Sequence, residues 1–453
     1  MRTWQRRAEP PAPLVAAHTA ALGCAVLGRI YAARGAQPGA GSDLTGLLAP
    51  DTLDGAPRAA ALLADAIAAG QRLLVVGDYD ADGATATAVA VRGLRAMGAQ
   101  VDYLVPDRQR EGYGLSPEVT TRALARRPQL IITVDHGIAG HAGIELAARH
   151  GVPVLVTDHH LPGPVLPPAA CIVNPNVPGA RFGSPHLAGV GVMFYVLLAL
   201  RALLRARGAF AGRSEPNLAG LLDLVALGTV ADVAALDANN RRLVAQGLAR
   251  IGAGRAQPGV LALLGRSVQA RGPVTAADLG FRAAPRLNAA GRLDDMTVGI
   301  ECLLTDDPAR AGELAARLEA LNQDRRALEA QMRDEALALI AALPTPPDDR
   351  PVLCVAQDHW HPGVVGLVAG RLRERYGRPV AAFAPAPDGL LRGSVRAVPG
   401  VHVRDALADA QAQHPDLMVR FGGHAMAAGL TLAPDRLHAF TEAFGQAVVR
   451  QLG

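Results

Sequence analysis

Acidic and imidazole side chains directly follow three short apolar segments of this sequence. RLLVVG (72–77) leads into DYDADG, LIITV (130–134) leads into DHG, and PVLVT (153–157) leads into DHH. The side chains concerned are Asp78, Asp80, Asp82, Asp135, His136, Asp158, His159 and His160, and a further acid, Asp232, follows the run LLDLVALGTVA.

Carboxylates that lie close together repel one another and raise each other's pKa, so a cation is needed to balance them. Oxygen ligands combined with one or two imidazoles suit Mn²⁺ or Mg²⁺ better than Zn²⁺. With four or more acids available, two ions can share a bridging carboxylate. Such a pair activates a water and stabilises both oxygens of an in-line displacement at phosphorus. The pattern therefore predicts a two-ion centre for phosphate ester chemistry.

The DYDADG segment has two other interpretations. A calcium loop of the EF-hand type requires a glutamate at its twelfth position, which is Val89 here, and a helix rather than a strand before it. A turn at the surface explains this segment alone, but not acidic or imidazole groups at three successive strand ends. The joint occurrence favours the metal centre.

Short, apolar, β-branched runs alternate with helical stretches in the first half of the chain. The runs are 72–77, 101–105, 130–134, 153–157 and 171–173, and the helical stretches between them cover roughly 83–97, 116–127 and 139–149. Strands that alternate with such helices predict βαβ units and a parallel sheet. Since the carboxyl ends of parallel strands line one crevice, we expect the acidic and imidazole groups to converge there.

The rest of the sequence divides into further segments. Residues 1–70 are rich in alanine and predict an N-terminal helical segment, whereas 71–305 predict the sheet domain with a helical insertion. One long charged helix is expected over 306–343 as a rigid connector, and prolines within 344–351 end it. Residues 351–453 predict a second, smaller α/β domain.

All 45 basic residues of the 453-residue chain are arginine. The lack of lysine excludes a Walker A loop, a Schiff-base enzyme and a protein-kinase core, and it leaves planar guanidinium groups to bind phosphate. The net charge of +4 is compatible with a polyanionic partner. Four cysteines without CxxC spacing and an N-terminus without a signal-peptide pattern predict a cytoplasmic protein. The longest apolar stretch, 187–200, is too short to span a membrane and predicts a buried helix.

An ordered set of motifs resembles the DHH phosphoesterase superfamily, and most closely its RecJ family of exonucleases. The set comprises GDYDADGATA, TVDHGI, VTDHH, ALGTVADV and the late RFGGHAMAAGL, in this order. AGVGVMFYVLLAL, LDANNRRLV, LGFRAAPRLNAAGRLDDM and HWHPGVVGLVAGRLRERYGRPV also resemble RecJ segments rather than those of shorter relatives. The resemblance implies a parallel-sheet DHH domain, joined by a long helix to a smaller α/β DHH-associated domain, with the active-site cleft between them.

The resemblance also implies a set of metal ligands for Mn²⁺ or Mg²⁺. They are Asp78, Asp80, Asp82, Asp135, His159 and Asp232. Asp80 and Asp82 are expected to hold one ion each, with Asp135 bridging, and the other ligands complete the two sites. The catalytic pair is Asp135 and His160, of which His160 is expected to orient the scissile phosphate or a metal-bound water.

Two positions depart from the family pattern. Many relatives have a histidine where this chain has Val76, so the first ion is expected to bind more weakly and to be filled last. His136 stands where relatives often have a small or polar residue. A supporting or purely structural role is expected for it, and ligation of an ion is the alternative.

The substrate contacts that the resemblance implies lie in several segments. Arg108 and Tyr113 of VPDRQREGYG are expected to contact nucleic acid, with Tyr113 stacking on a base. A tyrosine in a surface turn is the alternative for Tyr113. The other expected contacts are Arg286, Asn288, Ser394, Arg396, Gly422, Gly423 and His424. The glycines would let backbone N–H groups approach an anion.

The resemblance implies a metal-dependent 5′→3′ exonuclease that hydrolyses single-stranded DNA to 5′ mononucleotides in DNA recombination and repair. A single-strand-binding protein and a helicase are the further expected partners. Two alternatives stay open: a DHH-type oligonucleotide or cyclic-dinucleotide phosphodiesterase, and a non-catalytic DNA-binding replication scaffold. RecJ proteins usually continue into an OB-fold, whereas this sequence ends at Gly453. We therefore expect a core form or a truncated product, with weaker, more salt-sensitive DNA binding and lower processivity.

Overall fold

The computed structural model describes residues 8–37, 42–108, 111, 113–265, 272–343 and 350–452. They form two compact units, of which the first comprises Met1–Gly291 and Asp295–Glu319 and the second comprises Arg292–Asp294 and Ala320–Gly453. The division falls within the long helix expected over 306–343, so the domain limits expected from the sequence stay a prediction. The prolines expected to end that helix lie mostly within 344–349, outside the described residues.

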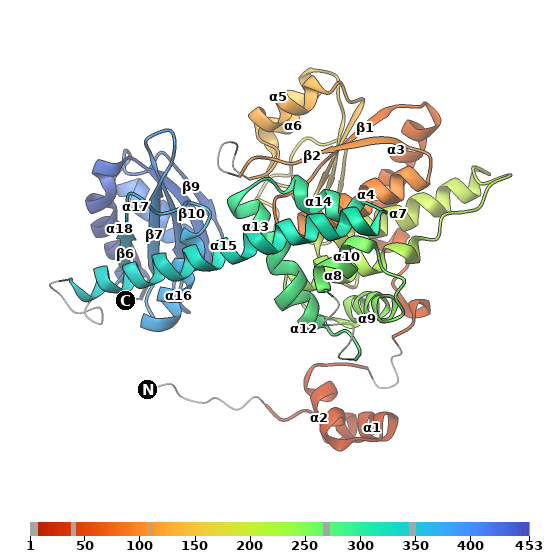
Figure 1. Ribbon diagram of the computed structural model, residues 1–453, viewed down its shortest axis with the longest axis horizontal. Coiled ribbons are helices and arrows are strands. Elements are labelled where there is room, and N and C mark those ends of the chain that lie inside the picture. Colours follow the sequence, from red (N-terminus) through yellow and green to blue (C-terminus); the bar gives the residue numbers. More distant parts are fainter. Residues whose placement is uncertain are drawn as a thin grey trace. The chain divides into compact units, whose positions relative to one another are not determined.

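A five-stranded parallel sheet forms the centre of the first unit (Figure 1). Its strands are β1 (Arg72–Val76), β2 (Gln100–Leu104), β3 (Leu130–Val134), β4 (Val154–Thr157) and β5 (Cys171–Val173), in the order β2-β1-β3-β4-β5. All four neighbouring pairs are parallel. The parallel sheet and the five predicted strands are confirmed, each strand to within one residue at either end.

Helices cover both faces of this sheet (Figure 1). They are α5 (Pro117–Ala125) and α6 (His141–Arg149) on one face, and α3 (Ala56–Ala68), α4 (Ala81–Ala96) and α7 (Gly189–Ala206) on the other. On the first face, Leu74, Ile131 and Val156 share a buried cluster with side chains of α5 and α6. Because both faces are covered, the central strands are apolar along most of their length.

Among the described residues, α7 is the one helix that is long and apolar enough to cross a membrane. Of its 18 residues, 61% are buried among the other elements of the chain. A mostly buried apolar helix is typical of the core of a soluble protein, and the buried helix predicted over 187–200 is confirmed.

Further α-helices and one π-helical turn precede or follow the sheet strands along the chain. They are α1 (Ala12–Leu22), α2 (Ala25–Ala33), α8 (Leu222–Ala231), α9 (Ala238–Gly252), α10 (Pro258–Leu264), α12 (Ala276–Asp278), a π-helical turn (Leu279–Ala283), α13 (Ala284–Leu293), α14 (Thr297–Leu304) and α15 (Pro308–Ala341). With 34 residues, mostly Ala, Leu, Glu and Arg, α15 is built from strong helix formers.

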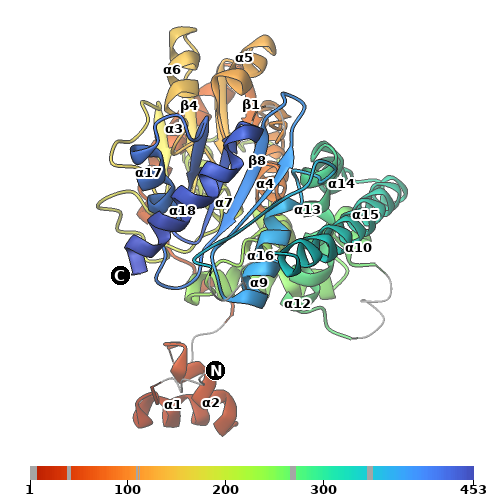
Figure 2. The ribbon, with the colours of Figure 1, turned by 90° about the vertical axis from the view of Figure 1, so that its left-hand side faces the viewer.

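The second unit is a smaller α/β sandwich. Its sheet has the order β6 (Leu353–Ala356), β7 (Val380–Pro385), β8 (Leu391–Arg396), β10 (Ala427–Leu432) and β9 (Arg420–Gly423). Only β6 and β7 pair in parallel among these strands. On one face the sheet packs against α16 (Val365–Tyr376) and the end of α15. On the other it packs against α17 (Val403–Gln413) and α18 (Leu437–Leu452), as Figure 2 shows. The α/β type predicted for this part is confirmed, whereas the cleft between the domains stays a prediction.

Candidate metal centre

The strand order places a topological switch point between β1 and β3. The chain leaves β1 toward β2 on one side, whereas β3 is followed by β4 and β5 on the other. Open parallel sheets bind ligands outside the carboxyl ends of the strands at such a point. The DYDADG segment follows β1, Asp135 follows β3, and the DHH triplet follows β4, so the fold brings all three to this crevice.

The N-termini of two helices hold the acids that follow β1. Asp80 is the N-cap residue of α4, and its Oδ1 accepts a hydrogen bond from the Gly83 N–H at 2.9 Å. Asp82, in the first turn of α4, accepts bonds from the N–H groups of Gly189 at 2.7 Å and Val190 at 3.0 Å. These two N–H groups begin α7, which has no side-chain cap of its own. Asp82 therefore serves as its cap from a distant part of the sequence.

Asp135 adopts a strained backbone conformation directly after β3. Its φ of 65° lies in the left-handed region, and its N–H donates to the Thr157 carbonyl at 3.0 Å. A Cβ atom at Gly189 would lie 2.4 Å from Asp135 Oδ1, so only glycine allows this approach of α7. Strain of this kind is characteristic of functional sites.

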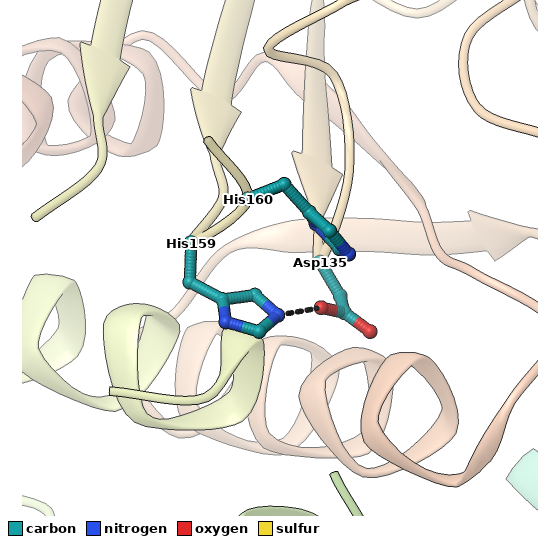
Figure 3. A group of neighbouring side chains, drawn as sticks. All are labelled: Asp135, His159 and His160. Atoms are coloured by element: carbon teal, nitrogen blue, oxygen red, sulfur yellow. Dashed lines mark ion pairs between the residues drawn. The ribbon is translucent and has the colours of Figure 1, made fainter. Parts of the chain in front are cut away.

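The two histidines after β4 have different partners, and Figure 3 shows that of His159, which is Asp135. His159 Nε2 lies 3.0 Å from Asp135 Oδ1, and His159 Nδ1 lies 4.0 Å from Asp232 Oδ2. His160 Nδ1 instead lies 2.7 Å from Asp158 Oδ1. One histidine therefore faces the acids, and the other is held by its own strand end.

Asp158 is a positioning residue that the sequence-based set of site residues omitted. Its carboxylate is buried and accepts the N–H groups of Ile138, His159 and His160, in addition to the His160 ring. Burial alone would raise the pKa of Asp158, but the bonds and charge of His160 lower it to about 2. The strand-end position of Asp158 was the signal that could have identified it.

Six expected metal ligands come together in the first unit. The possible ligand groups are Asp78, Asp80 and Asp135; Asp82, His159 and Asp232; and Asp135, His159 and His160, each with its ligand atoms within 4.8 Å of one another. Asp135 and His159 each belong to two groups. The three groups are therefore contiguous, as two ions with a shared carboxylate would require.

The electrostatics of these groups favour a bound cation. Burial, and then the neighbouring carboxylates, raise the pKa of Asp78, Asp82 and Asp135 well above the ordinary value. Burial, followed by the charge of Asp80, raises the pKa of Asp232 to about 6. Asp135 Oδ1 is buried and has no hydrogen-bond partner among the described residues. An uncompensated buried carboxylate is costly, so the residues present fit divalent cations.

The two histidines carry different charges. Burial, followed by the charge of His160, lowers the pKa of His159 to about 4, so this imidazole is neutral and able to ligate an ion. Burial would also lower the pKa of His160, but the hydrogen bond and charge of Asp158 outweigh it and raise this pKa to about 9. His160 is therefore a cation at neutral pH.

Arg108 and Tyr113 border the metal centre. The Tyr113 hydroxyl donates to the Asp135 carbonyl at 3.2 Å, and its ring centroid lies 5.9 Å from that of His160. Tyr113 is 50% exposed, which suits a ring that stacks on a base. Arg108 lies over the ring of Tyr79, with its Cζ atom 4.8 Å from the centroid.

The side chains of Arg286 and Asn288, on α13, bond to other residues of the protein, whereas the sequence predicts that they contact substrate. The guanidinium of Arg286 donates to Glu319 and to the Leu263 carbonyl, so it holds α13 against neighbouring helical segments. Asn288 Oδ1 accepts the Ala81 N–H at 2.9 Å, directly after Asp80. These contacts assign both side chains to positioning, and their contact with substrate stays a prediction.

The expected phosphate-binding residues of the second unit share one sheet. Arg396 donates to Ser394 Oγ at 2.7 Å on β8, and Ser394 pairs with Gly429, which in turn pairs with Gly422. Gly423 has a φ of 143°, and a Cβ there would lie 2.5 Å from the Ala428 backbone. The His424 N–H donates to Ala427 in the turn that follows β9. The sheet brings these residues together.

The two departures from the family pattern have different surroundings. His136 is fully buried, and both of its ring nitrogens are without a hydrogen-bond partner among the described residues. Burial lowers its pKa to about 4. It belongs to none of the three ligand groups, which favours the structural role over ligation. Val76 is buried and shares the apolar cluster beneath α5 and α6.

Comparisons with known proteins agree with this architecture. The model of the DHH family, N-terminal domain, matches residues 72–229, and that of the DHHA1 domain matches 349–450. The single-stranded-DNA-specific exonuclease RecJ of Dickeya dadantii is 54% identical over 430 residues, which cover 94% of this chain and 75% of the relative.

Two solved structures of RecJ from Thermus thermophilus are also similar. The complex with Mn²⁺ has a TM-score of 0.81 and 36% identity, and it covers 98% of this chain and 62% of the solved chain. The complex with Mg²⁺ has a TM-score of 0.74 and 33% identity, and it covers 98% of this chain and 60% of the solved chain. From the fold, the metal centre and these similarities together, the chain belongs to the RecJ family of DHH-domain proteins.

Proposed function

We propose that this protein is a metal-dependent exonuclease that hydrolyses single-stranded DNA from its 5′ end to 5′ mononucleotides. The observation that supports this most directly lies at the switch point of the sheet, where Asp78, Asp80 and Asp135 form one candidate ligand group and Asp82, His159 and Asp232 form another. The two groups adjoin, because His159 Nε2 lies 3.0 Å from Asp135 Oδ1. The RecJ relatives are named for single-stranded-DNA-specific exonuclease activity, and two of their structures contain Mn²⁺ or Mg²⁺.

Asp78, Asp80 and Asp135 would hold one ion, and the group that contains Asp82 and His159 would hold the second. When bound, the two ions would lower the pKa of a water and stabilise the charge on the phosphate oxygens. Asp135 belongs to the first group, and its Oδ1 lies 3.0 Å from His159 Nε2 of the second group. This arrangement supports Asp135 as the bridging ligand.

His160 supplies a different function from His159. Asp158 keeps the imidazole of His160 protonated, so a charged hydrogen-bond donor lies beside the ligand groups. A phosphate oxygen is the natural acceptor for such a donor. His160 would therefore orient the scissile phosphate, while Tyr113 stacks on a base and Arg108 binds the phosphate at the 5′ end. In the second unit, Ser394 and Arg396 are proposed as further hydrogen-bond donors to phosphate.

The test is a nuclease assay with Mn²⁺ on three substrates. They are a 5′-phosphorylated single strand labelled at either end, the duplex of the same strand, and a linear dinucleotide. We expect the wild type to release 5′ mononucleotides from the single strand first, and Asp135→Asn to lose at least about 10²-fold in rate. Equal activity of the variant would contradict the metal centre. A higher rate on the dinucleotide than on the strand would favour an oligonucleotide phosphodiesterase.

The cellular setting is part of the same proposal. We place the protein in the cytoplasm, in DNA recombination and repair, with a single-strand-binding protein and a helicase as partners. Its cysteines, Cys24, Cys171, Cys302 and Cys354, are all unpaired thiols, which suits a reducing compartment. Co-purification from cells before and after DNA damage would test the partners.

A further inference from the structure

Tyr79 lies in the middle of the DYDADG segment, but metal binding does not account for its side chain. Its ring supports the guanidinium of Arg108, whose Cζ atom is 4.8 Å from the ring centroid. The same ring meets Tyr113 edge-on, with the centroids 6.1 Å apart and the planes at 74°. Tyr79 therefore contacts both residues that border the metal centre on this side.

The backbone of Tyr79 is firmly held. Its N–H donates to Asp78 Oδ1 at 2.7 Å. A Cβ atom at Gly291 would lie 1.7 Å from the Tyr79 carbonyl oxygen, so α13 packs directly against this peptide and only glycine fits there. The Tyr79 peptide is therefore held in place, and the ring that it carries contacts Arg108 and Tyr113.

Within the described part of the chain, the Arg108 guanidinium makes no hydrogen bond or ion pair and lies against the face of Tyr79. Its charge also acts on the buried Asp78 carboxylate, where it opposes the rise in pKa that burial causes. An aromatic face attracts a guanidinium electrostatically without using any of its five N–H donors. A carboxylate partner would instead occupy the donors and neutralise the charge. The contact with Tyr79 restricts the side chain and leaves its planar group available for phosphate.

We propose that Tyr79 is a positioning residue that holds Arg108 ready for the 5′-terminal phosphate of the strand. The inference rests on the proposed function, because it assigns the terminal phosphate to Arg108. It goes further in naming the residue that sets the preference for a 5′-phosphate over a 5′-hydroxyl. Tyr79 acts through Arg108 and makes no contact with the reacting atoms.

The test compares 5′-phosphorylated and 5′-hydroxyl single strands of one sequence, with Mn²⁺, and measures kcat and KM for each. Tyr79→Phe keeps the ring, so the ratio of kcat/KM between the two strands is expected to stay at the wild-type value. Tyr79→Leu keeps apolar bulk but removes the ring, and it should lower that ratio about threefold to thirtyfold, mainly through KM. Arg108→Gln should lower the ratio at least as far, and Tyr79→Leu should lower it no further in that background.

Tyr103→Leu provides a matched control, since the Tyr103 hydroxyl bonds to Glu301 on α14 instead of contacting Arg108. It should leave the ratio unchanged. The inference is overturned if Tyr79→Leu keeps the wild-type ratio, or if it slows both strands equally, which is the result expected of damage to the metal loop alone. A wild-type enzyme that does not distinguish the two strands would also overturn it, while leaving the exonuclease proposal intact.

Binding of the same two strands to Asp135→Asn, measured by fluorescence anisotropy, separates this inference from the proposed function. If the wild type hydrolysed neither strand, the proposed function would fail. The ratio of the two dissociation constants, with and without Tyr79→Leu, would still report on the contact between Tyr79 and Arg108. The inference is supported if the preference for the 5′-phosphorylated strand falls when Tyr79→Leu removes the ring, and it is contradicted if that preference is unchanged.

Discussion

Asp135 is the residue at which the demands of folding and of metal binding conflict most directly. It is 2% exposed, it has a left-handed backbone, and it is surrounded by other carboxylates. Its raised pKa means that the ionised form is unfavourable in the folded protein. A group whose pKa is raised in this way lowers stability once the pH exceeds its pKa in the unfolded chain.

Asp135→Asn should therefore stabilise the metal-free protein although it removes activity. Asparagine also tolerates the left-handed backbone, whereas alanine would add strain. We expect the first unit to unfold about 2–4 °C higher than in the wild type, measured by calorimetry in EDTA, for about 1 kcal/mol of relief. Mn²⁺ should raise the unfolding temperature of the wild type more than that of the variant.

Asp102→Asn is the control for this prediction, because Asp102 is 65% exposed and pairs with Arg126 at the surface. Surface pairs of this kind contribute little, so its unfolding temperature should change by about 1 °C or less. A lower unfolding temperature for Asp135→Asn than for the wild type in EDTA would show that repulsion among the acids does not govern this site.

The pair of Asp158 and His160 should make the stability of the metal-free protein depend on pH. The pKa of His160 is about 9 in the folded protein, above its ordinary value. Its contribution is therefore complete below about pH 6.5 and is lost as the pH rises through about 9. Urea unfolding in EDTA between pH 6 and 10 should show this decline in the wild type, and His160→Gln should remove it.

His438→Gln is the matched control, since the His438 side chain is 87% exposed on α18. It should leave the decline as it is in the wild type. An unchanged decline in His160→Gln would mean that another group is responsible. In that case Asp158 would not be the residue that keeps His160 protonated.

At the scale of elements, the site depends on the close approach of α7 to the end of β3. Gly189→Ala would place a methyl group 2.4 Å from Asp135 Oδ1, at the point where the α7 N-terminus is capped by Asp82. We expect a loss of about 2–3 kcal/mol in the free energy of unfolding and weaker Mn²⁺ binding. Chemical denaturation and calorimetric titration would measure the two effects.

Gly312→Ala tests the same substitution where nothing opposes it. A Cβ atom at Gly312, within α15, meets no atom within 4 Å. Alanine in a helix interior should stabilise the protein by about 0.5–1 kcal/mol. If Gly189→Ala were as harmless as Gly312→Ala, the contact between α7 and Asp135 would not constrain the site.

The sequence was sufficient for the elements and for the ligand types, but not for the supporting contacts. Hydrophobic runs predicted five strands to within one residue, because a parallel sheet covered on both faces leaves a nearly continuous apolar signal. The strand order β2-β1-β3-β4-β5 is a tertiary property that no single run encodes. The hydrogen bond from the Ala81 N–H to Asn288 Oδ1 joins residues 207 positions apart, so no local pattern could predict it; the resemblance implied only a contact of Asn288 with substrate.

At the scale of the whole molecule, metal binding belongs to only one of two independent cores. All six proposed ligands lie in the first unit, whereas the buried clusters beside β7 and β8 consist of side chains of the second unit. A ligand that binds the folded state alone stabilises the part that it contacts.

Calorimetry of the whole chain should therefore show two unfolding transitions. At about 100 times the dissociation constant, Mn²⁺ contributes about 2.7 kcal/mol, which should raise the first unit's transition by several degrees. The transition of the second unit should stay within about 1 °C of its position in EDTA. Equal shifts of both transitions would show that the two units unfold as one.

The distribution of the ligands along the chain also has a consequence during protein synthesis. The DYDADG acids leave the ribosome early, but Asp232 follows Asp135 only after six more helical or strand segments have been made. At about 5–20 residues per second, this delay is on the order of 10 s. A chain still being translated lacks the second ion's ligand set throughout that time. The full set of proposed ligands is thus available only when most of the first unit has been made, so a chain still being translated cannot hold the second ion with all of them.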